Sequence, residues 1–370
     1  MRRILYEKQP GKEIVYVSVV FDKQISDPAN ITIKDDESVL DSILSQFRRC
    51  LCKKTTEGEV AICWLDDKNS NFYEDGTPAI LTGEEGDVMV YFPEFWYKWE
   101  KIDDNKFKYM FSLSNAGKDW KHVTRSLLSA YKAYLDYDKI YSRSDVTPTT
   151  GESVGQFTKC ANNRGYGYQI IDFQQHCTIA FMLYSKYKTR DLQYILGAGG
   201  ATIDTQTGSS NITGIADSKN ESSKYVCGLG LEGVFGGAFE YVGGVSVSKN
   251  AFTITDPDGS THIVHANTFY TGSGWVKNIA AEDGPFFDVI PTITTGGNGG
   301  FYADYFWHSS GSNLYFARSC EQSYDRGGVS SVYAATYSYV ASPNTGSRLS
   351  FRGIIHEISS TSEFKSLPLL

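Results

Sequence analysis

The sequence predicts an α+β protein, in which strand-rich segments precede and follow a helical middle. Strand patterns occupy residues 13–21, 59–65 and 86–92, helical patterns lie between residues 153 and 189, and short strand-like pieces return after residue 197. Because the helices are gathered together and do not alternate with strands, the pattern argues against a wound α/β sheet. With 35 Gly, 10 Pro and 14% aromatic residues, the chain has the composition of a folded, turn-rich protein.

Charge and cysteine content narrow the class of protein. The net charge of -8 and the lack of a long basic run argue against nucleic acid or an anionic membrane as the main partner. The first residues lack the apolar stretch and small-residue cleavage site of a secretory signal, and no apolar run is long enough to span a bilayer. The chain has seven cysteines, an odd number, and their spacings follow no pattern. We therefore expect reduced thiols in a protein that is made in a cytoplasm and is not secreted through a signal peptide.

Residues 1–85 have the pattern of a small N-terminal module. Residues 13–21 and 59–65 are expected strands, and residues 37–51 an expected amphipathic helix with Val39, Ile43, Leu44 and Phe47 on one face. Turn residues follow the second strand. We expect an α/β or β-rich attachment module that ends at residue 85.

Residues 86–199 contain the expected strand and two expected helices of the second region. Apolar alternation predicts a strand over residues 86–92 that Pro93 breaks. A Thr-rich loop over residues 141–153 precedes a helix that ends at Gly165. A longer helix is expected to begin at Asp172, which has the side chain of a good N-cap.

Residues 197–274 are rich in Gly, Ser, Thr and Asn, with short strand-like pieces between them. The run Asp256-Pro257-Asp258-Gly259 predicts the turn of a hairpin. A calcium loop was the alternative for this run, but it lacks the ligand spacing and the final bidentate Glu, so the turn is preferred.

The stretch from residue 301 to 348 is crowded with Tyr, Ser, Gly, Asn and Arg, and Lys is absent from residue 278 through 364. The binding surfaces of antibodies are enriched in the same residue types, because Tyr gives a rigid amphipathic contact surface and Ser, Gly and Asn form adaptable hydrogen bonds. Lys is depleted from interface cores. The alternative is an ordinary β-rich core, but residues 331–342 alternate apolar and polar side chains less cleanly than a core strand does. We therefore expect a binding surface.

The polar residues show no arrangement typical of catalysis. His262 and His265 would point to opposite faces of a strand, and no Glu or Cys completes a metal set with them. The fingerprints of serine hydrolases, P-loop proteins and dinucleotide-binding proteins are absent. We expect no catalytic residues, no cofactor and no bound transition metal or calcium.

Three segments, taken in order, resemble one family. Residues 164–199 are similar to the glycine turn, strand and long helix of C-type-lectin-like domains of the formylglycine-generating-enzyme type. Gly236, Gly237, Phe239, Glu240 and Tyr241 are similar to the diagnostic central motif, and Gly346, Arg348 and Leu349 to the closing G-x-R-L motif. The match covers about residues 86–357 and looks most like phage and prophage tail or receptor-binding proteins, including those diversified by diversity-generating retroelements.

The chain also departs from that family. Gly237, Phe239 and Tyr241 stand where relatives usually have Asn and Trp. Only Cys320 lies in the C-terminal third, so the two-thiol chemistry of the enzymes has no second ligand. Independently of the resemblance, an unpaired Glu240 among aromatic residues would be costly, so we expect it to be buried and hydrogen-bonded, with Arg348 as an anchoring hydrogen-bond donor.

The resemblance implies a C-type-lectin-like ligand-display domain over residues 86–370. The residues expected on the binding face are Tyr302, Asp304, Tyr305, Tyr315, Ser319, Ser323, Tyr324, Asp325, Ser330, Tyr333, Tyr337 and Tyr339. The residues expected in the scaffold beneath them are Phe306, Phe316, Leu349 and Phe351. Adenine-directed diversification, if inherited with the resemblance, would leave Trp307, Glu321 and Gln322 fixed.

The function implied is that of a non-enzymatic receptor-binding protein in a virion tail that is assembled in the bacterial cytoplasm. Its expected partners are a host cell-surface receptor, either protein or glycan, and other tail proteins through the N-terminal module. A homo-oligomer is expected, with a trimer as its expected form, and no nucleic acid or membrane insertion. The alternatives are a structural tail or baseplate protein without receptor binding, and a formylglycine-generating-type enzyme that has lost its thiols.

Overall fold

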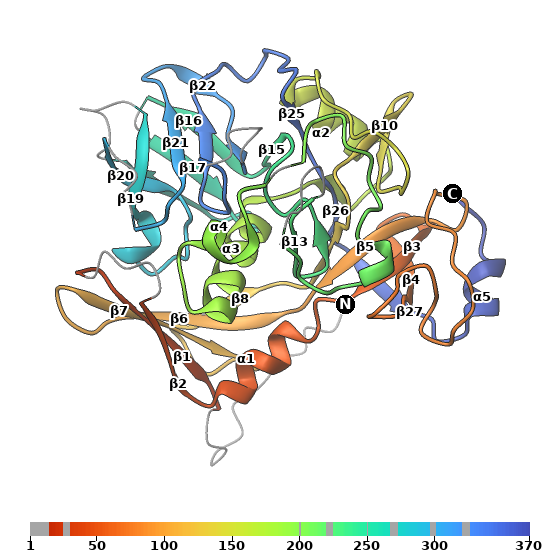
Figure 1. The fold of residues 1–370 in the computed structure, drawn as a ribbon, viewed down its shortest axis with the longest axis horizontal. Helices are drawn as coiled ribbons and strands as arrows, with labels where there is room; N and C mark the ends of the chain where they lie inside the picture. Colours follow the sequence, from red (N-terminus) through yellow and green to blue (C-terminus); the bar gives the residue numbers. More distant parts are fainter. Residues whose placement is uncertain are drawn as a thin grey trace.

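The computed structural model describes residues 15–24, 30–199, 201–219, 225–249, 251–266, 273–296, 301–319 and 326–370. Within these residues the protein has a mixed α+β fold made mostly of sheets, as the sequence predicts (Figure 1). The α-helices are α1 (Glu37–Leu44), α2 (Val154–Asn162), α3 (Phe173–Tyr187), α4 (Leu192–Leu196) and α5 (Thr361–Ser366). Two short 3-10 turns are η1 (Asn211–Thr213) and η3 (Ala280–Glu282).

Two sheets carry most of the first half of the chain. The N-terminal sheet is antiparallel, in the order β2 (Ile31–Asp35), β1 (Val17–Asp22), β7 (Lys106–Ser112), β6 (Phe95–Lys101) and β8 (Lys121–Val123). The central sheet has the order β12 (Tyr168–Ile170), β26 (Leu349–Phe351), β9 (Ser126–Ser129), β5 (Asp87–Phe92), β3 (Arg49–Thr56), β4 (Glu59–Trp64) and β27 (Ile354–Glu357). Only β4 and β27 pair in parallel there.

The second half of the chain forms the other sheets. The C-terminal sheet has the order β20 (Pro291–Thr295), β19 (Gly274–Ile279), β21 (Tyr305–His308), β24 (Val332–Ala334), β23 (Ala317–Arg318), β15 (Phe239–Tyr241) and β25 (Thr345–Gly346). The hairpin sheet has the order β18 (Thr261–His265), β17 (Ala251–Thr255), β16 (Val245–Ser248) and β22 (Ser312–Leu314). Two small ladders pair β10 (Tyr134–Asp136) with β11 (Lys139–Tyr141), and β13 (Cys227–Gly228) with β14 (Leu231–Glu232).

Helix α3 begins at the predicted N-cap. The carboxylate of Asp172 accepts the backbone N–H of Gln175 at 2.9 Å, and the Gln175 side chain accepts the backbone N–H of Asp172 at 3.1 Å. This reciprocal pair satisfies two donors that a helix start otherwise leaves free. At the other end Lys188 adopts a left-handed conformation and stops the helix.

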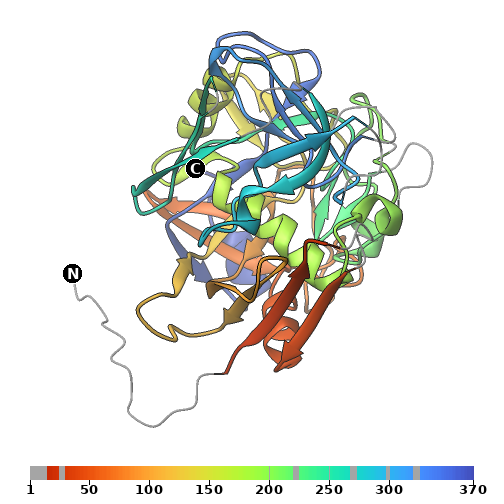
Figure 2. The same cartoon turned by 90° about the vertical axis from the view of Figure 1, so that its left-hand side faces the viewer.

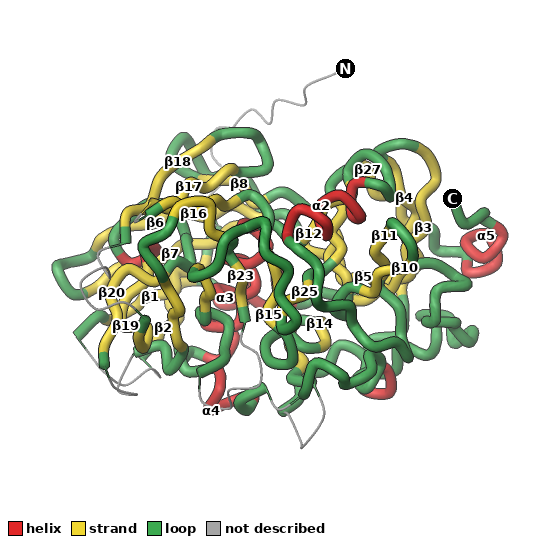
Figure 3. Tube along the Cα trace, turned by 90° about the horizontal axis from the view of Figure 1, so that it is seen from above, coloured by secondary structure: helices red, strands yellow, loops and turns green. Residues whose placement is uncertain are grey.

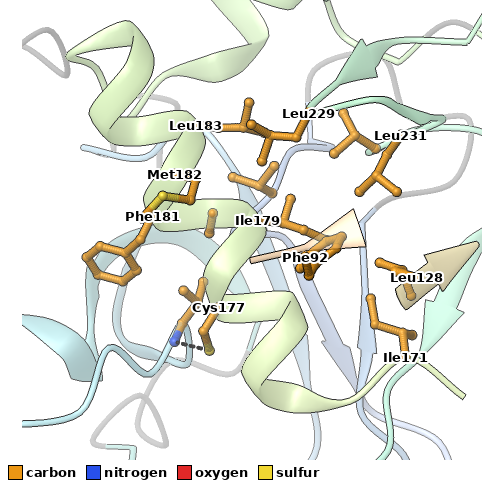
Figure 4. Packing of buried hydrophobic residues seen from close by; sticks show 14 of the residues in the cluster. Phe92, Leu128, Ile171, Cys177, Ile179, Phe181, Met182, Leu183, Leu229 and Leu231 are labelled. Carbon is orange, nitrogen blue, oxygen red and sulfur yellow. Dashed lines mark hydrogen bonds between the residues drawn. The ribbon is translucent and has the colours of Figure 1, made fainter. Parts of the chain in front are cut away.

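Three sheets pack against α3, which explains why nearly all of its side chains are buried. Phe181 contacts Phe21 of the N-terminal sheet at 5.8 Å between ring centroids. Leu128 of the central sheet belongs to the same buried cluster, and Figure 4 shows it with Phe92 beside the helix. His176 on the remaining side accepts a hydrogen bond from Arg318 of the C-terminal sheet. Figure 2 shows the helix running behind the red strands β1 and β2.

Several features that the sequence predicts around α3 are confirmed. Strands β5 and β26 both pair with β9 in antiparallel fashion, so the strand expected over residues 86–92 and the closing motif at Leu349 lie in one sheet. Helix α2 starts at Ser153, whose hydroxyl accepts the backbone N–H of Gln156, and the segment stops at Gly165 with a φ of 118°. The hairpin β17–β18 turns at the predicted residues, where the backbone N–H of Gly259 donates to the carbonyl of Asp256 at 2.8 Å.

The helix predicted over residues 37–51 is wrong in its second half. Helix α1 ends at Leu44, and strand β3 begins at Arg49. Arg49 is buried and donates to the carbonyl oxygen of Gly230 at 2.7 Å and to the hydroxyl of Ser210 at 2.7 Å. Pairing with β4 and β5 and these long-range hydrogen bonds outweigh a helical propensity that is worth only a fraction of a kcal/mol per residue.

The expected module boundary at residue 85 falls inside a sheet. Strands β3 and β4 precede it and β5 follows it, and β3 pairs with both. Strand β1 likewise pairs with β7. The described residues before position 86 therefore do not form a separately packed module, because their sheets and core are completed by strands from later in the chain.

Candidate functional site

The Tyr-rich segment enters the C-terminal sheet, where alternation along the strands sorts its side chains into two faces. In β21, Phe306 points into the core and is fully buried, while Tyr305 and Trp307 point to the other face and are half-buried. Trp307 lies opposite Tyr333 of β24, which is also half-buried. Because side chains along a strand alternate between faces, one face of this sheet gathers aromatic rings.

These rings form a continuous row, which we call the aromatic row. Its members are Trp275, Tyr305, Trp307, Phe239, Tyr333 and Tyr315. The centroid separations are 5.5 Å for Trp275–Tyr305, 4.7 Å for Tyr305–Trp307, 5.5 Å for Phe239–Trp307, 5.2 Å for Phe239–Tyr333 and 5.5 Å for Tyr315–Tyr333. The guanidinium of Arg326 lies 4.9 Å above the Tyr305 ring. Such a row offers stacking and CH contacts to a ligand.

The loop that follows β24 carries the two most exposed tyrosines among the described residues of the Tyr-rich segment. Tyr337 and Tyr339 are 47% and 74% exposed, and their rings stack at 5.4 Å with an angle of 9° between the planes. The backbone between them is held in place, since the N–H of Ser338 donates to the carbonyl of Asn313 at 2.8 Å. Exposed rings on a pinned backbone are what low-entropy ligand contact requires.

Five of the twelve residues expected on the binding face are buried, so the expectation that they lie on the surface is wrong. They are Tyr302, Asp304, Tyr315, Ser319 and Ser330. The other described members are exposed, in the case of Tyr337 and Tyr339, or half-buried, in the case of Tyr305 and Tyr333. Ser323, Tyr324 and Asp325 lie outside the described residues.

Polar partners inside the protein explain this burial. The hydroxyl of Tyr302 donates to Glu282 at 2.7 Å. Asp304 accepts the backbone N–H of Ser330 at 2.9 Å and the side-chain amide of Gln193 at 2.8 Å, and burial raises the pKa of Asp304 to about 7. The hydroxyl of Ser319 accepts the backbone N–H of Gly236 at 2.9 Å. These residues pin the backbone that displays the others.

A buried charge cluster lies under the aromatic row, on the inner face of the same sheet. Glu240 has no exposed surface, and one of its oxygens accepts Lys132 and Arg348 at 2.7 Å each, while the other accepts Arg318. Arg318 also donates to Nδ1 of His176 at 3.1 Å. The expectation that Glu240 is buried and hydrogen-bonded is confirmed.

Arg348 uses the whole of its guanidinium in this cluster. Besides Glu240, it donates to the carbonyl oxygens of Ser129 and Ala130 at 3.1 Å each, and to those of Glu232 and Gly233 at 2.6 and 2.7 Å. It therefore ties the closing motif to β9, to β14 and to the central motif, as the prediction of an anchoring role requires. The predicted scaffold residues Phe306, Phe316, Leu349 and Phe351 are likewise buried.

Burial and neighbouring charges set the protonation states of the cluster. Burial by itself raises the pKa of Glu240, but Arg348, Lys132 and Arg318 outweigh it and hold that pKa well below its usual range. Burial, only partly opposed by Glu240, lowers the pKa of Lys132 to about 8. Burial and Arg318 lower the pKa of His176 to about 3, so its ring is neutral. With no exposed surface at Glu240, Arg318 or Arg348, the cluster acts as an anchor and not as an acid or base.

The sequence prediction missed Lys132, Arg318 and His176 as members of this cluster. Lys132 is the one charged residue in the mostly apolar run of residues 126–135, and a lysine in such a setting is a signal of buried pairing. The aromatic row members Trp275, Trp307 and Phe239 were also missed, because their neighbours across the sheet come from distant parts of the chain.

Neither a metal-binding cluster nor a membrane-spanning helix is present among the described residues. Among the described residues no group of three or more His, Cys, Asp or Glu side chains is arranged to hold a metal ion. His262 instead hydrogen-bonds Asp288 at 2.8 Å, while His265 lies three residues further along β18 and is exposed. In the described parts of the chain, no helix has the length and apolarity needed to cross a membrane.

Comparison with known proteins gives no assignment. No protein-family model matches the chain, and no curated protein matches its sequence.

Proposed function

We propose that this protein is a receptor-binding protein of a phage or prophage tail, with a C-type-lectin-like fold that presents a Tyr-rich surface to a host receptor. The proposal depends most on one observation: the stacked, exposed pair Tyr337 and Tyr339 lies next to the half-buried rings Tyr305, Trp307 and Tyr333 of the aromatic row. Single exposed aromatic side chains are ordinary, but a stacked pair of them on a fixed loop beside further accessible rings is typical of a binding site.

The buried charge cluster supports the same proposal. Glu240 of the central motif and Arg348 of the closing motif contact each other directly, so the two segments that carry the resemblance meet in space. The cluster fixes the inner face of the sheet whose outer face carries the aromatic row. A rigid base below a tolerant surface lowers the entropic cost of binding.

The binding face that we propose is smaller than the sequence suggested. It consists of Tyr305, Trp307, Tyr333, Tyr337 and Tyr339. Aromatic stacking suits the flat apolar face of a sugar ring or an apolar protein surface, so both receptor classes remain within the proposal.

Fluorescently labelled full-length protein, applied to a panel of intact bacterial strains and read by flow cytometry, tests this function. We expect saturable binding to a subset of strains. The double variant Tyr337→Ala/Tyr339→Ala should lose on the order of 2–4 kcal/mol of affinity, because each aromatic contact is worth about 1–2 kcal/mol. Tyr137→Ala is the matched control, since Tyr137 is 97% exposed on the β10–β11 turn and is not part of the proposed binding face.

Two outcomes count against the proposal. If the double variant and the Tyr137 control bind the same strains equally, the pair is not the contact surface. If the wild-type protein binds no strain, the protein is better explained as a structural tail component that uses the same fold only to pack against its neighbours.

A further inference from the structure

A second polar site lies between β3, the start of β5, strand β11 and the C-terminal residues Leu369 and Leu370. Figures 1 and 3 show these elements on the side of the molecule away from β19 and β20 of the C-terminal sheet. It is a cavity of about 240 Å³. Five cationic side chains line it, Lys53, Lys54, Lys139, Arg143 and Arg164, and one acidic side chain, Asp87. The whole chain has a net charge of -8, so this concentration of positive charge runs against its overall balance.

The two arginines are held in a fixed arrangement around one tyrosine. The guanidinium of Arg143 lies 4.0 Å from the centroid of the Tyr141 ring, and that of Arg164 lies 4.2 Å from it. Arg164 also donates to Asp87 at 2.6 Å and to the carbonyl of Ile140 at 2.9 Å. Like charges are thus brought together on both sides of an aromatic ring whose π-electrons stabilise them.

Ion pairs do not neutralise all of this charge. Arg164 pairs with Asp87, Arg143 with Asp136 at 3.1 Å, and Lys54 with Glu57. Five cations less these three carboxylates and the α-carboxylate of Leu370, which also lines the cavity, leave an excess of one positive charge.

The two lysines left over are Lys53 and Lys139, which form no ion pair within the part of the chain that the structure describes. Lys53 is buried and donates to the carbonyl oxygens of Phe364, Lys365 and Leu367 at 3.1, 3.2 and 2.8 Å. Burial lowers the pKa of Lys53 and Glu85 partly opposes this. The three donors of Lys53 are used by these carbonyl oxygens, so Lys139 is the lysine whose ammonium group can meet a ligand.

We propose that this cavity binds an oxyanion, a phosphate or sulfate group, either as the free ion or as the end of a small organic molecule. A phosphate monoester carries between about 1.5 and 2 negative charges at neutral pH, so an excess of positive charge favours its binding. Its oxygens are the preferred partners of guanidinium and ammonium donors. The site is separate from the binding face proposed above and does not depend on that function.

Isothermal titration calorimetry on the full chain tests the site, with inorganic phosphate, sulfate and glycerol phosphate as ligands and with chloride at equal ionic strength as the reference. We expect saturable binding of the oxyanions beyond that of chloride. Tighter binding of glycerol phosphate than of inorganic phosphate identifies an organic phosphate as the ligand. Equal binding identifies the free ion, and both results support the site.

Lys139→Met is the decisive variant, because methionine keeps the apolar stem of the half-buried lysine and removes its charge. Its affinity for phosphate should fall roughly tenfold, and Lys139→Arg should restore it. Lys118→Met, at an exposed lysine elsewhere, is the control and should bind as the wild type does.

Thermal unfolding in increasing phosphate gives a second measurement that does not depend on binding heats. A ligand that binds only the folded state raises the melting temperature, so phosphate should stabilise the wild type more than the Lys139→Met variant. The inference is overturned if none of the oxyanions binds beyond chloride, or if Lys139→Met binds and is stabilised as the wild type is.

Discussion

The two faces of the C-terminal sheet are built from alternate residues of the same strands, yet they have opposite chemistry. In β15, Glu240 points to the buried charge cluster, while its neighbours Phe239 and Tyr241 point to the other face of the sheet, where aromatic partners bury both. In β21, Phe306 is in the core and Trp307 faces outward. The inner face fixes the backbone and the outer face presents side chains, so position along the strand, and not membership of a Tyr-rich segment, decides which residues can meet a ligand.

The largest expected effect comes from breaking the inner face. Arg348→Met removes one partner of Glu240 and leaves four backbone carbonyl oxygens without their donor. Loss of one member of a buried ion pair should lower the free energy of unfolding by on the order of 4 kcal/mol, measured by urea denaturation. Lys118→Met, at an exposed cation, should change it by less than about 0.5 kcal/mol. Equal stability of the two variants would contradict the anchoring role of Arg348.

Two tyrosines of the Tyr-rich segment, one buried and one exposed, test whether burial separates anchoring residues from residues that can meet a ligand. Tyr302→Ala removes a buried ring and leaves Glu282 without its hydroxyl donor, so it should cost on the order of 3 kcal/mol of stability. Tyr339→Ala removes a ring that is 74% exposed and should cost less than about 0.5 kcal/mol. Thermal and urea unfolding of both variants provide the measurement, and similar losses would mean that burial does not separate the two roles.

The backbone of the central motif lies very close to the backbone at Gly199, and Gly236 makes this close approach possible. Gly236 has a φ of 83°, and a Cβ there would lie 2.5 Å from the Cα of Gly199. Gly259 has a similar φ of 84° with nothing within 4 Å. Gly236→Ala should therefore destabilise the protein by on the order of 2 kcal/mol more than Gly259→Ala, since only the first adds a clash to the backbone strain. Urea denaturation of the two variants gives the difference, and a difference near zero would show that the approach can relax.

A smaller, pH-dependent effect is expected at an ion pair of the hairpin sheet. The hydrogen bond to Asp288 and the ion pair with Asp256, at 3.5 Å, outweigh burial and raise the pKa of His262 to about 9. Because this folded-state pKa exceeds the value of about 6.5 in the unfolded chain, the stabilisation is complete below about pH 6.5 and is lost as the pH rises through 9.

The comparison of wild type with His262→Gln isolates this effect, because all other titrating groups are common to both. The stability difference between them should shrink by about 1 kcal/mol from pH 6.5 to pH 9, after allowance for solvent screening. Urea denaturation across this range gives the curve. A difference that does not change with pH would show that His262 is not charged in the folded protein.

The sequence by itself determined the features that depend on neighbours in the chain. The α+β class, the start of α3 at Asp172, the break at Pro93 and the hairpin turn before Gly259 each follow from local propensity, capping or turn chemistry. The burial of Glu240 also followed, because a carboxylate among aromatic residues has few other ways to be tolerated. These predictions needed no knowledge of distant contacts.

Only the tertiary structure decided where helix α1 stops and which tyrosines can reach a ligand. Arg49 becomes part of a strand because its partners Ser210 and Gly230 lie far along the chain. Tyr302 and Tyr339 belong to the same Tyr-rich segment, but one meets Glu282 in the core and the other meets solvent. Burial and long-range pairing are properties of the whole packed chain, and their energies exceed the local preferences that a sequence pattern records.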